Sequence, residues 1–191
     1  MSDMEARLTE NLEPDLAEAD PRPRISTYHD MPYALFRYGP EEEFALRHQV
    51  RLLETRLSQK GKRIHRISLA ECLEAAMRSQ RSMEEWFAAE REQGVGSIVE
   101  TVHAVLAEYM PLIELVAERM PEGPDPVRDI VFILRTGALF PAYRTFSLLE
   151  QLKGRVQVPT VLFYPGYLDG AAGLQFMGVL DAEHNYRPKI Y

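Results

Sequence analysis

This chain of 191 residues has few of the features that mark secreted, membrane or zinc-binding proteins. It contains one cysteine, Cys72, so neither an intrachain disulfide nor a four-cysteine zinc site can form. No apolar run approaches the roughly 20 residues that a membrane helix needs, and the N-terminus lacks the pattern of a secretory signal. We therefore expect a cytoplasmic protein.

Basic residues are also in deficit, with 22 Lys and Arg against 29 Asp and Glu and a net charge of −7. This balance excludes a protein that coats DNA, because a basic surface supplies most of that affinity. Residues 1–30 alone hold eight acidic and three basic residues. The remaining chain is close to neutral, so its charge does not exclude local contacts with nucleic acid.

The acidic N-terminal segment is expected to be a short helix and a linker. Met4, Leu8 and Leu12 recur every four residues, which predicts a narrow apolar stripe on a helix that Pro14 would end or kink. The prolines that follow are typical of a linker. We expect residues 1–30 to precede a single α/β domain at 31–191.

Strand and helix signals alternate in that domain. Apolar or alternating runs predict strands at 33–38, 62–67, 129–134, 158–164 and 174–180. The loop before 174–180 is too short for a crossover helix, so this last strand should be antiparallel to its partner. Helical periodicity follows Pro40 and spans 141–152.

A helical insert is expected at about 69–120. Three capping-box pairs mark helix starts there: Ser68 with Glu71, Ser82 with Glu85, and Ser97 with Glu100. Pro111 should kink or split the last helix. The sequence thus predicts a layered α/β fold whose mainly parallel sheet is flanked by helices, with this insert and an antiparallel C-terminal strand.

The loop after the first expected strand does not carry a phosphate-binding motif. It reads Gly39-Pro40-Glu41-Glu42-Glu43, where proline removes a needed N–H and three carboxylates occupy the positive end of the helix. The fold would be P-loop-like but degenerate, without a Walker A motif. This loop argues against ATP hydrolysis of the P-loop type.

Other catalytic and metal-binding patterns are missing from the sequence. There is no GxSxG elbow, and the five histidines never pair at helical spacing. Residues 181–184 (DAEH) fit a polar surface turn better than a metal site. Cys72 shares a helix face with Leu69 and Leu73, which favours a buried structural thiol over a nucleophile. We name no catalytic residue, metal or cofactor.

One candidate surface is a cluster of basic residues between positions 56 and 66. Its members are Arg56, Lys60, Lys62, Arg63 and Arg66. The cluster could bind nucleic acid or an acidic partner. A solvated helix end and a polar strand face are the favoured interpretation, because stacking aromatics are not interleaved with the cations.

The second candidate surface lies in the loops that follow the strands, where ligands of open α/β sheets usually bind. Arginine, tyrosine and glycine gather there: Arg135, Thr136, Gly137, Tyr143, Arg144, Tyr164, Gly166, Asn185, Tyr186 and Arg187. Such residues could bind an anion or a protein partner. Tyrosine and arginine that simply lock the loops together are at least as good an interpretation.

These loops also carry a family resemblance. The segments VFILRTGALFPAYRTFSLLEQL, VPTVLFYPGY and LQFMGVLDAEHNYRPKIY resemble the BrxB family of BREX bacteriophage-exclusion systems. The ordered set of RTG, FP-x-YR, FYPG and NYR carries the likeness, and YALFRYGPEEEFALRHQVRLLETRL resembles the N-terminal half of that family. Together these segments cover most of residues 30–191, whereas about 75–128 show little resemblance.

The resemblance implies an accessory component of phage defence. Its expected partners are a PglZ phosphatase-like protein, an adenine methyltransferase and a large ATPase. The leading hypothesis is a non-enzymatic adaptor. The first alternative is a nucleotide or nucleic-acid sensor that uses Arg135, Arg144 and Arg187, or the 56–66 cluster. The last is a metal-dependent nuclease using Asp169, Asp181 and Glu183.

Overall fold

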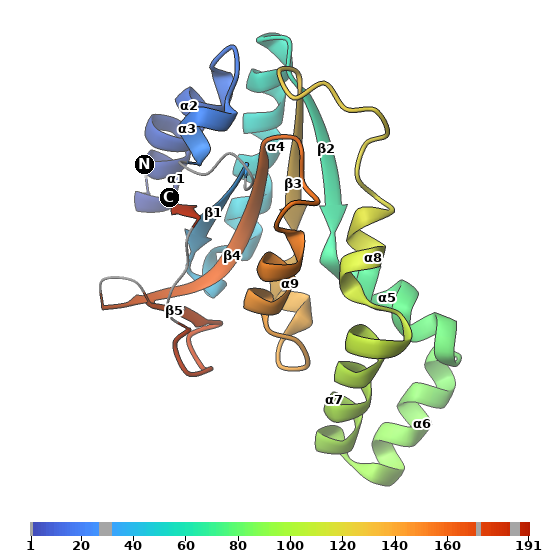
Figure 1. Ribbon diagram of the computed structural model, residues 1–191. Coiled ribbons are helices and arrows are strands. Elements are labelled where there is room, and N and C mark those ends of the chain that lie inside the picture. Colours follow the sequence, from blue (N-terminus) through green and yellow to red (C-terminus); the bar gives the residue numbers. More distant parts are fainter. Residues whose placement is uncertain (1, 27–31, 171–172, 184–187) are drawn as a thin grey trace.

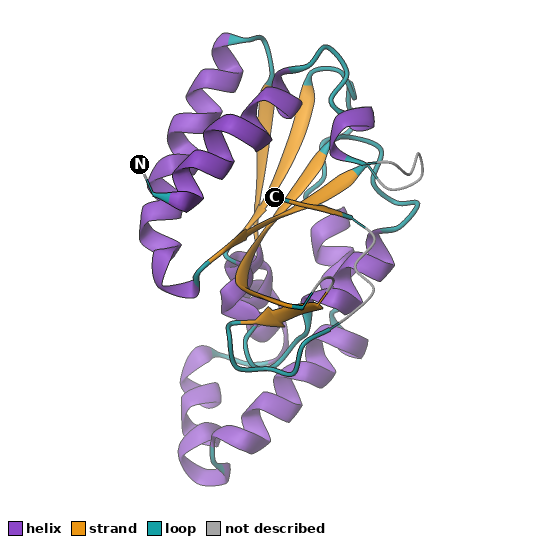
Figure 2. Cartoon of the chain, turned by 90° about the vertical axis from the view of Figure 1, so that its left-hand side faces the viewer, coloured by secondary structure: helices purple, strands orange, loops and turns teal. Residues whose placement is uncertain are grey.

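A parallel β-sheet lies at the centre of the fold, with helices on both of its faces (Figures 1 and 2). The computed structural model describes residues 2–26, 32–170, 173–183 and 188–191. The strands in these residues are β1 (Tyr33–Tyr38), β2 (Arg63–Ser68), β3 (Asp129–Leu134), β4 (Thr160–Asp169), β5 (Gly173–Phe176) and β6 (Lys189–Ile190).

The strand order is β2-β3-β4-β1-β6, and every neighbouring pair along it is parallel. β5 pairs antiparallel with the end of β4. The expected α/β class, with its mainly parallel sheet and antiparallel C-terminal strand, is confirmed. The likeness to P-loop folds stays a prediction.

The helices are grouped by their place in the chain. The N-terminal helical segments are α1 (Asp3–Ala6), the π-helix η1 (Arg7–Leu12), α2 (Glu13–Ala17) and α3 (Arg22–Ile25). After β1 come the 3-10 turn η2 (Pro40–Glu42) and α4 (Glu43–Gln59). The insert holds α5 (Leu69–Gln80), α6 (Met83–Gln93), α7 (Val95–Ala104), the π-helix η3 (Val105–Tyr109) and α8 (Leu112–Ala117). The 3-10 turn η4 (Thr136–Leu139) and α9 (Thr145–Leu152) follow β3.

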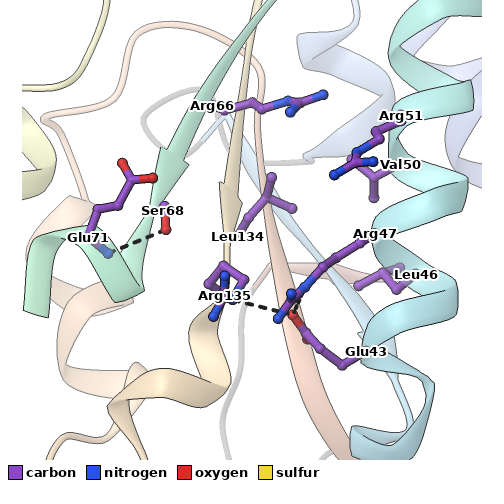
Figure 3. Close-up of a pocket in the computed structure, with 10 residues that line it drawn as sticks. All are labelled: Glu43, Leu46, Arg47, Val50, Arg51, Arg66, Ser68, Glu71, Leu134 and Arg135. Carbon is purple, nitrogen blue, oxygen red and sulfur yellow. Dashed lines mark hydrogen bonds and ion pairs between the residues drawn. The ribbon is translucent and has the colours of Figure 1, made fainter.

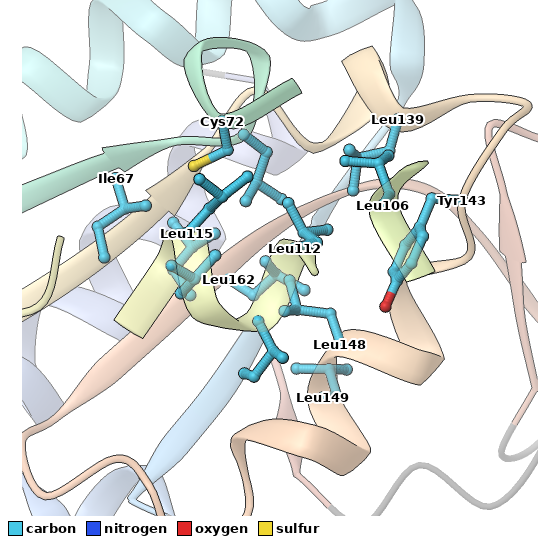
Figure 4. Packing of buried hydrophobic residues seen from close by; sticks show 14 of the residues in the cluster. Ile67, Cys72, Leu106, Leu112, Leu115, Leu139, Tyr143, Leu148, Leu149 and Leu162 are labelled. Atoms are coloured by element: carbon cyan, nitrogen blue, oxygen red, sulfur yellow. The ribbon is translucent and has the colours of Figure 1, made fainter. Parts of the chain in front are cut away.

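Each face of the sheet has its own hydrophobic core, because successive side chains of a strand point to opposite faces. On one face, the rings of Phe36 and Phe132 lie 5.6 and 5.2 Å from the ring of Phe163, and α4 and the N-terminal helices cover them. On the other face, Leu162 packs with leucines of α8 and α9 (Figure 4). Cys72 is fully buried in this second core, as the sequence predicted.

The insert ends in a helical hairpin that projects beyond the carboxyl edge of the sheet (Figures 1 and 2). We call residues 82–110, which contain α6 and α7, the arm. Ser68 and Ser82 cap α5 and α6 as predicted, and the chain breaks at Pro111 between η3 and α8. The helix start predicted at Ser97 is wrong, since Gly94 (φ 85°) separates α6 from α7 and Ser97 lies inside α7.

The N-terminal helices are part of the core on the α4 side. Met4, Leu8, Leu12 and Leu16 are buried there, which extends the predicted apolar stripe by one turn. Pro14 does not end the helical segment. A π-helical turn precedes it, so the proline falls in the first turn of α2, where a backbone N–H is not needed. The division of the chain at residue 30 stays a prediction.

β4 is longer than the sequence predicted, because it continues past Tyr164 to Asp169. Pro165 lies opposite Tyr38, the last residue of β1, where β4 leaves the parallel sheet and begins to pair with β5. A missing N–H is tolerated at such a margin. The segment expected as a loop after Tyr164 is therefore one arm of a β-hairpin, whereas β5 ends earlier than predicted and α9 begins later.

Candidate functional site

A pocket of about 320 Å³ lies where β2 and β3 end beside α4 (Figure 3). This is the edge of the sheet where ligands of open α/β folds bind. The pocket is lined by Glu43, Leu46, Arg47, Val50, Arg51, Arg66, Ser68, Glu71, Leu134 and Arg135. The loop after β1, which leads to Glu43, and the loop after β3, which begins at Arg135, meet here.

Glu43 organises the base of this pocket. It accepts a hydrogen bond from the hydroxyl of Tyr38, and its Oε1 accepts another from Arg47 Nε at 2.8 Å. Arg135 Nε lies 3.7 Å from the same oxygen. Burial and the hydrogen bond to Glu43 raise the pKa of Tyr38, so its hydroxyl stays protonated and continues to donate. One carboxylate therefore holds two guanidinium groups in place.

Arg51 and Arg66 approach each other across the other end of the pocket, from α4 and β2 (Figure 3). Arg66 donates to both carboxylate oxygens of Glu54. For the exposed guanidinium of Arg51, the described residues supply no hydrogen bond or ion pair. Arg51 is thus a cation that can pair with a ligand without breaking a contact inside the protein.

All three glutamates after β1 accept hydrogen bonds from other groups of the same chain. The Gly39 N–H donates to Glu42 Oε2 at 3.0 Å, and the Tyr167 hydroxyl donates to Glu41 Oε2 at 2.6 Å. Glu43 is held by Tyr38 and Arg47 as above. These carboxylates occupy the turn before α4 that a phosphate loop would use, and negative charge at this position favours the helix dipole.

Four of the predicted strand-end residues are buried and hold the loops together. The Thr136 hydroxyl donates to the carbonyl of Phe163 at 2.7 Å, and the Tyr143 hydroxyl accepts from Gln151 at 3.3 Å. The ring of Tyr164 packs in the core beside β5. A Cβ on Gly166 would lie 2.3 Å from the carbonyl oxygen of Gln175, so the hairpin requires glycine there.

The other predicted strand-end residues do not form one site. Arg135 and Gly137 line a cavity of about 190 Å³ next to the main pocket. Arg144 lines a different cavity, against α7, and lies 3.5 Å from the carboxylate of Glu183. The remaining three, Asn185, Tyr186 and Arg187, lie outside the described residues.

The predicted basic cluster is engaged with the chain itself. Arg56 and Lys60 donate to the buried carboxylate of Glu13 at 2.7 and 3.0 Å, and Lys62 donates to the carbonyl oxygens of Glu18 and Val127. The acidic partner of this part of the cluster is therefore the N-terminal segment of the same chain.

The rest of the cluster pairs with carboxylates beside it. Arg66 pairs with Glu54 as described, and Arg63 donates to both oxygens of Asp129 at 2.8 Å. His65 Nε2 lies 2.8 Å from the same carboxylate. Burial raises the pKa of Asp129, but the hydrogen bonds from His65, Asp125 and Arg63 outweigh burial and leave this pKa below 3.8.

Arg47 and Arg51 were missed by the sequence analysis. With Glu43 they form an i, i+4, i+8 series, which places all three side chains on one face of α4. That spacing, starting at the loop after β1, is the signal that could have identified them.

The described residues offer no group of three His, Cys, Asp or Glu side chains that could hold a metal ion. Of the residues assigned to a nuclease, Asp169 ends β4, while Glu183 pairs its backbone with Leu174 and its carboxylate with Arg144. In the same described parts of the chain, no helix is long and apolar enough to cross a membrane.

Comparisons with known proteins agree with the resemblance seen in the sequence. The profile of the family described as "BREX protein BrxB" matches residues 65–190, including the helical insert. A protein of Bacillus cereus (strain H3081.97) named "BREX protein BrxB" is 25% identical over 186 residues, which covers 95% of each chain. No solved structure shows significant similarity. The chain belongs to the BrxB family.

Proposed function

We propose that this protein is a non-enzymatic adaptor of a BREX phage-defence complex and that it acts through protein contacts. Membership in the BrxB family makes it a BREX component. The observation that carries the adaptor role is the arm, which combines projection from the body, excess negative charge and exposed apolar side chains.

The charge of the arm is strongly one-sided. Residues 82–110 hold six acidic residues and one basic residue, Arg91. The acidic side chains are Glu84, Glu85, Glu90, Glu92, Glu100 and Glu108, and the described structure places all six at the surface. A basic protein surface would complement this charge and would be steered towards the arm.

The arm also exposes large apolar side chains. Phe87 is 53% exposed, Val95 63% and Tyr109 68%. Exposed aromatic and aliphatic groups within a charged rim are typical of protein-binding surfaces. The expected partner surface is therefore basic, with an apolar depression that receives Phe87.

Buried side chains of the arm anchor it to the body of the protein. Trp86 of α6 is buried, its indole N–H donates to the carbonyl of Met77 at 2.9 Å, and the Arg81 guanidinium lies 4.3 Å from its ring centroid. Ile98 and Val102 are buried in the core shared with α5 and α8. A pre-organised arm loses less conformational entropy on binding than a flexible one.

Co-expression with the neighbouring defence proteins tests this proposal. The partners to include are the PglZ phosphatase-like protein, the adenine methyltransferase and the large ATPase, with the tagged chain as bait. We expect the bait to retain at least one of them, and Phe87→Ala or Glu84→Lys/Glu90→Lys to reduce the retained amount. Phe44→Ala is the matched control, because Phe44 is 79% exposed on α4, a helix that packs in the other hydrophobic core from the arm.

A bait that retains none of the three proteins would contradict the adaptor role. Equal losses for Phe87→Ala and Phe44→Ala would exclude the arm as the contact surface. Circular dichroism of each variant separates these results from a failure to fold.

A further inference from the structure

We propose that the arginine-lined pocket at the ends of β2 and β3 binds a small phosphorylated ligand, of the size of a nucleoside monophosphate. The pocket is built from α4, β2, β3 and the start of α5, none of which belongs to the arm. This inference is therefore independent of the adaptor role.

The charge of the pocket favours an anion. Arg47, Arg51, Arg66 and Arg135 line it from two helix turns, a strand and a loop, whereas Glu43 and Glu71 are its only acidic lining residues among those described. Glu54 neutralises Arg66 from outside the lining. Glu43 is shared between two guanidinium groups, so the pocket keeps positive charge after its internal pairs are formed.

The directions of the donors favour phosphate. Figure 3 shows guanidinium groups entering from α4 on one side and from β2 and the loop after β3 on the other. A tetrahedral phosphate offers three acceptor oxygens to donors that converge from several sides, whereas a planar carboxylate matches a single fork. Ser68, at the start of α5, adds a hydroxyl and the positive end of a 12-residue helix.

The remaining lining favours an organic ligand over a bare ion. Leu46, Val50 and Leu134 form an apolar wall beside the arginines (Figure 3). A volume of about 320 Å³ falls within the range of small-molecule sites and exceeds what an inorganic ion needs. The apolar wall would hold a planar base while the arginines hold the phosphate.

Arg135 gives independent support for a functional pocket. Its backbone is left-handed (φ 61°), a conformation that is sterically unfavourable for a residue with a side chain. Strained residues of this kind cluster at binding sites, where the strain positions a side chain. Here it aims the guanidinium at Glu43 and the pocket.

Titration calorimetry at low salt tests the proposal with AMP, ADP, inorganic phosphate, pyrophosphate and citrate. We expect AMP or ADP to bind at least tenfold more tightly than inorganic phosphate, and the affinity to fall with added salt. Arg51→Gln should weaken this binding roughly tenfold or more, since it removes one charge-assisted contact without breaking a contact inside the protein.

Arg91→Gln is the matched control, because Arg91 is an exposed arginine of the arm. It should bind the nucleotides as the unmodified protein does, and both variants should keep the same melting temperature. Flat titrations with every phosphate compound, binding of citrate alone, or equal weakening in the two variants would overturn the proposal. Equal affinity for AMP and inorganic phosphate would overturn the role of the apolar wall.

Discussion

Among the individual side chains, Asp129 shows how hydrogen bonds stabilise a charged group that is almost completely buried. Asp129, at the amino end of β3, is 3% exposed and receives hydrogen bonds from Arg63, His65 and the amide of Asp125. A buried carboxylate without partners would be neutralised by protonation. The four hydrogen bonds from these three residues keep Asp129 ionised and join the starts of β2 and β3.

Asp129→Asn should lower the free energy of unfolding by about 1–3 kcal/mol at pH 7, because Asn cannot accept all of these hydrogen bonds. The pKa of Asp129 is lower in the folded state than its ordinary value of 3.8. Its stabilising contribution is therefore complete above pH 3.8 and is lost as the pH falls through the folded-state pKa. Urea denaturation between pH 7 and 3 measures this difference.

Asp181→Asn provides the comparison, since Asp181 is exposed. This control variant should track the unmodified protein across the pH range. A gap between Asp129→Asn and the unmodified protein that widens below pH 3.8 would contradict the expected sign.

At the scale of elements, the β4–β5 hairpin depends on a close approach of two backbones. Gly166 lies opposite Phe176, and its Cα faces both the carbonyl of Gln175 and the ring of Tyr164. A Cβ there would lie 2.3 and 2.6 Å from these groups, so the backbone would have to move. The hairpin in turn covers the carboxyl end of the sheet through Phe176, which packs on Tyr164.

Gly166→Ala should therefore lower the free energy of unfolding by about 1–3 kcal/mol, the usual cost of overpacking. Gly96→Ala is the matched substitution, because a Cβ at this position in α7 meets nothing within 4 Å. That change should be stabilising by about 0.5–1 kcal/mol, as expected for alanine in a helix. Thermal denaturation of the two variants gives the comparison, and equal shifts would show that the close contact is not limiting.

At the scale of the whole molecule, the uneven charge of the sequence becomes an internal contact. The acidic N-terminal segment lies against α4, where Glu13 pairs with Arg56 and Lys60. Asp15 of the same segment accepts hydrogen bonds from the Lys189 ammonium and the Tyr191 hydroxyl near the C-terminus, both at 2.6 Å. Arg7 donates to the carbonyl oxygens of Arg37 and Tyr191. Both ends of the chain are thus tied to the edge of the sheet formed by β1 and β6 (Figure 1).

Glu13→Gln should destabilise the protein by about 1–3 kcal/mol. The side chain of Glu13 is 8% exposed, and a neutral amide in its place would leave the cations of Arg56 and Lys60 without their negative partner. Glu10→Gln, on the exposed side of the same helical segment, should have little effect. Denaturant titrations of both variants check this, and equal stability of the two would mean that the N-terminal segment contributes only through its leucines.

Much of the fold could be predicted locally. The runs at 33–38 and 129–134 coincide with β1 and β3, because a strand buried on both faces is apolar throughout and needs no context to identify. The helix caps at Ser68 and Ser82 could also be predicted, because each is a hydrogen bond between residues three positions apart in the sequence. The continuation of β4 through Pro165 could not be predicted, since it depends on where β1 ends beside it.

The α/β class, the helical insert, the family and the absence of a phosphate-loop motif after β1 can all be identified from the sequence, because periodicity, caps and motifs depend on residues that are close in the chain. The pocket arises only when the chain is folded. The strand order brings the end of β3 beside the end of β2 and under α4, so Arg135 meets Arg47, Arg51 and Arg66 from distant parts of the chain. The packing also brings three residues of the basic cluster, Arg56, Lys60 and Lys62, against the acidic N-terminal segment of the same chain. Pairing between charges that are distant in the sequence depends on packing and not on their spacing.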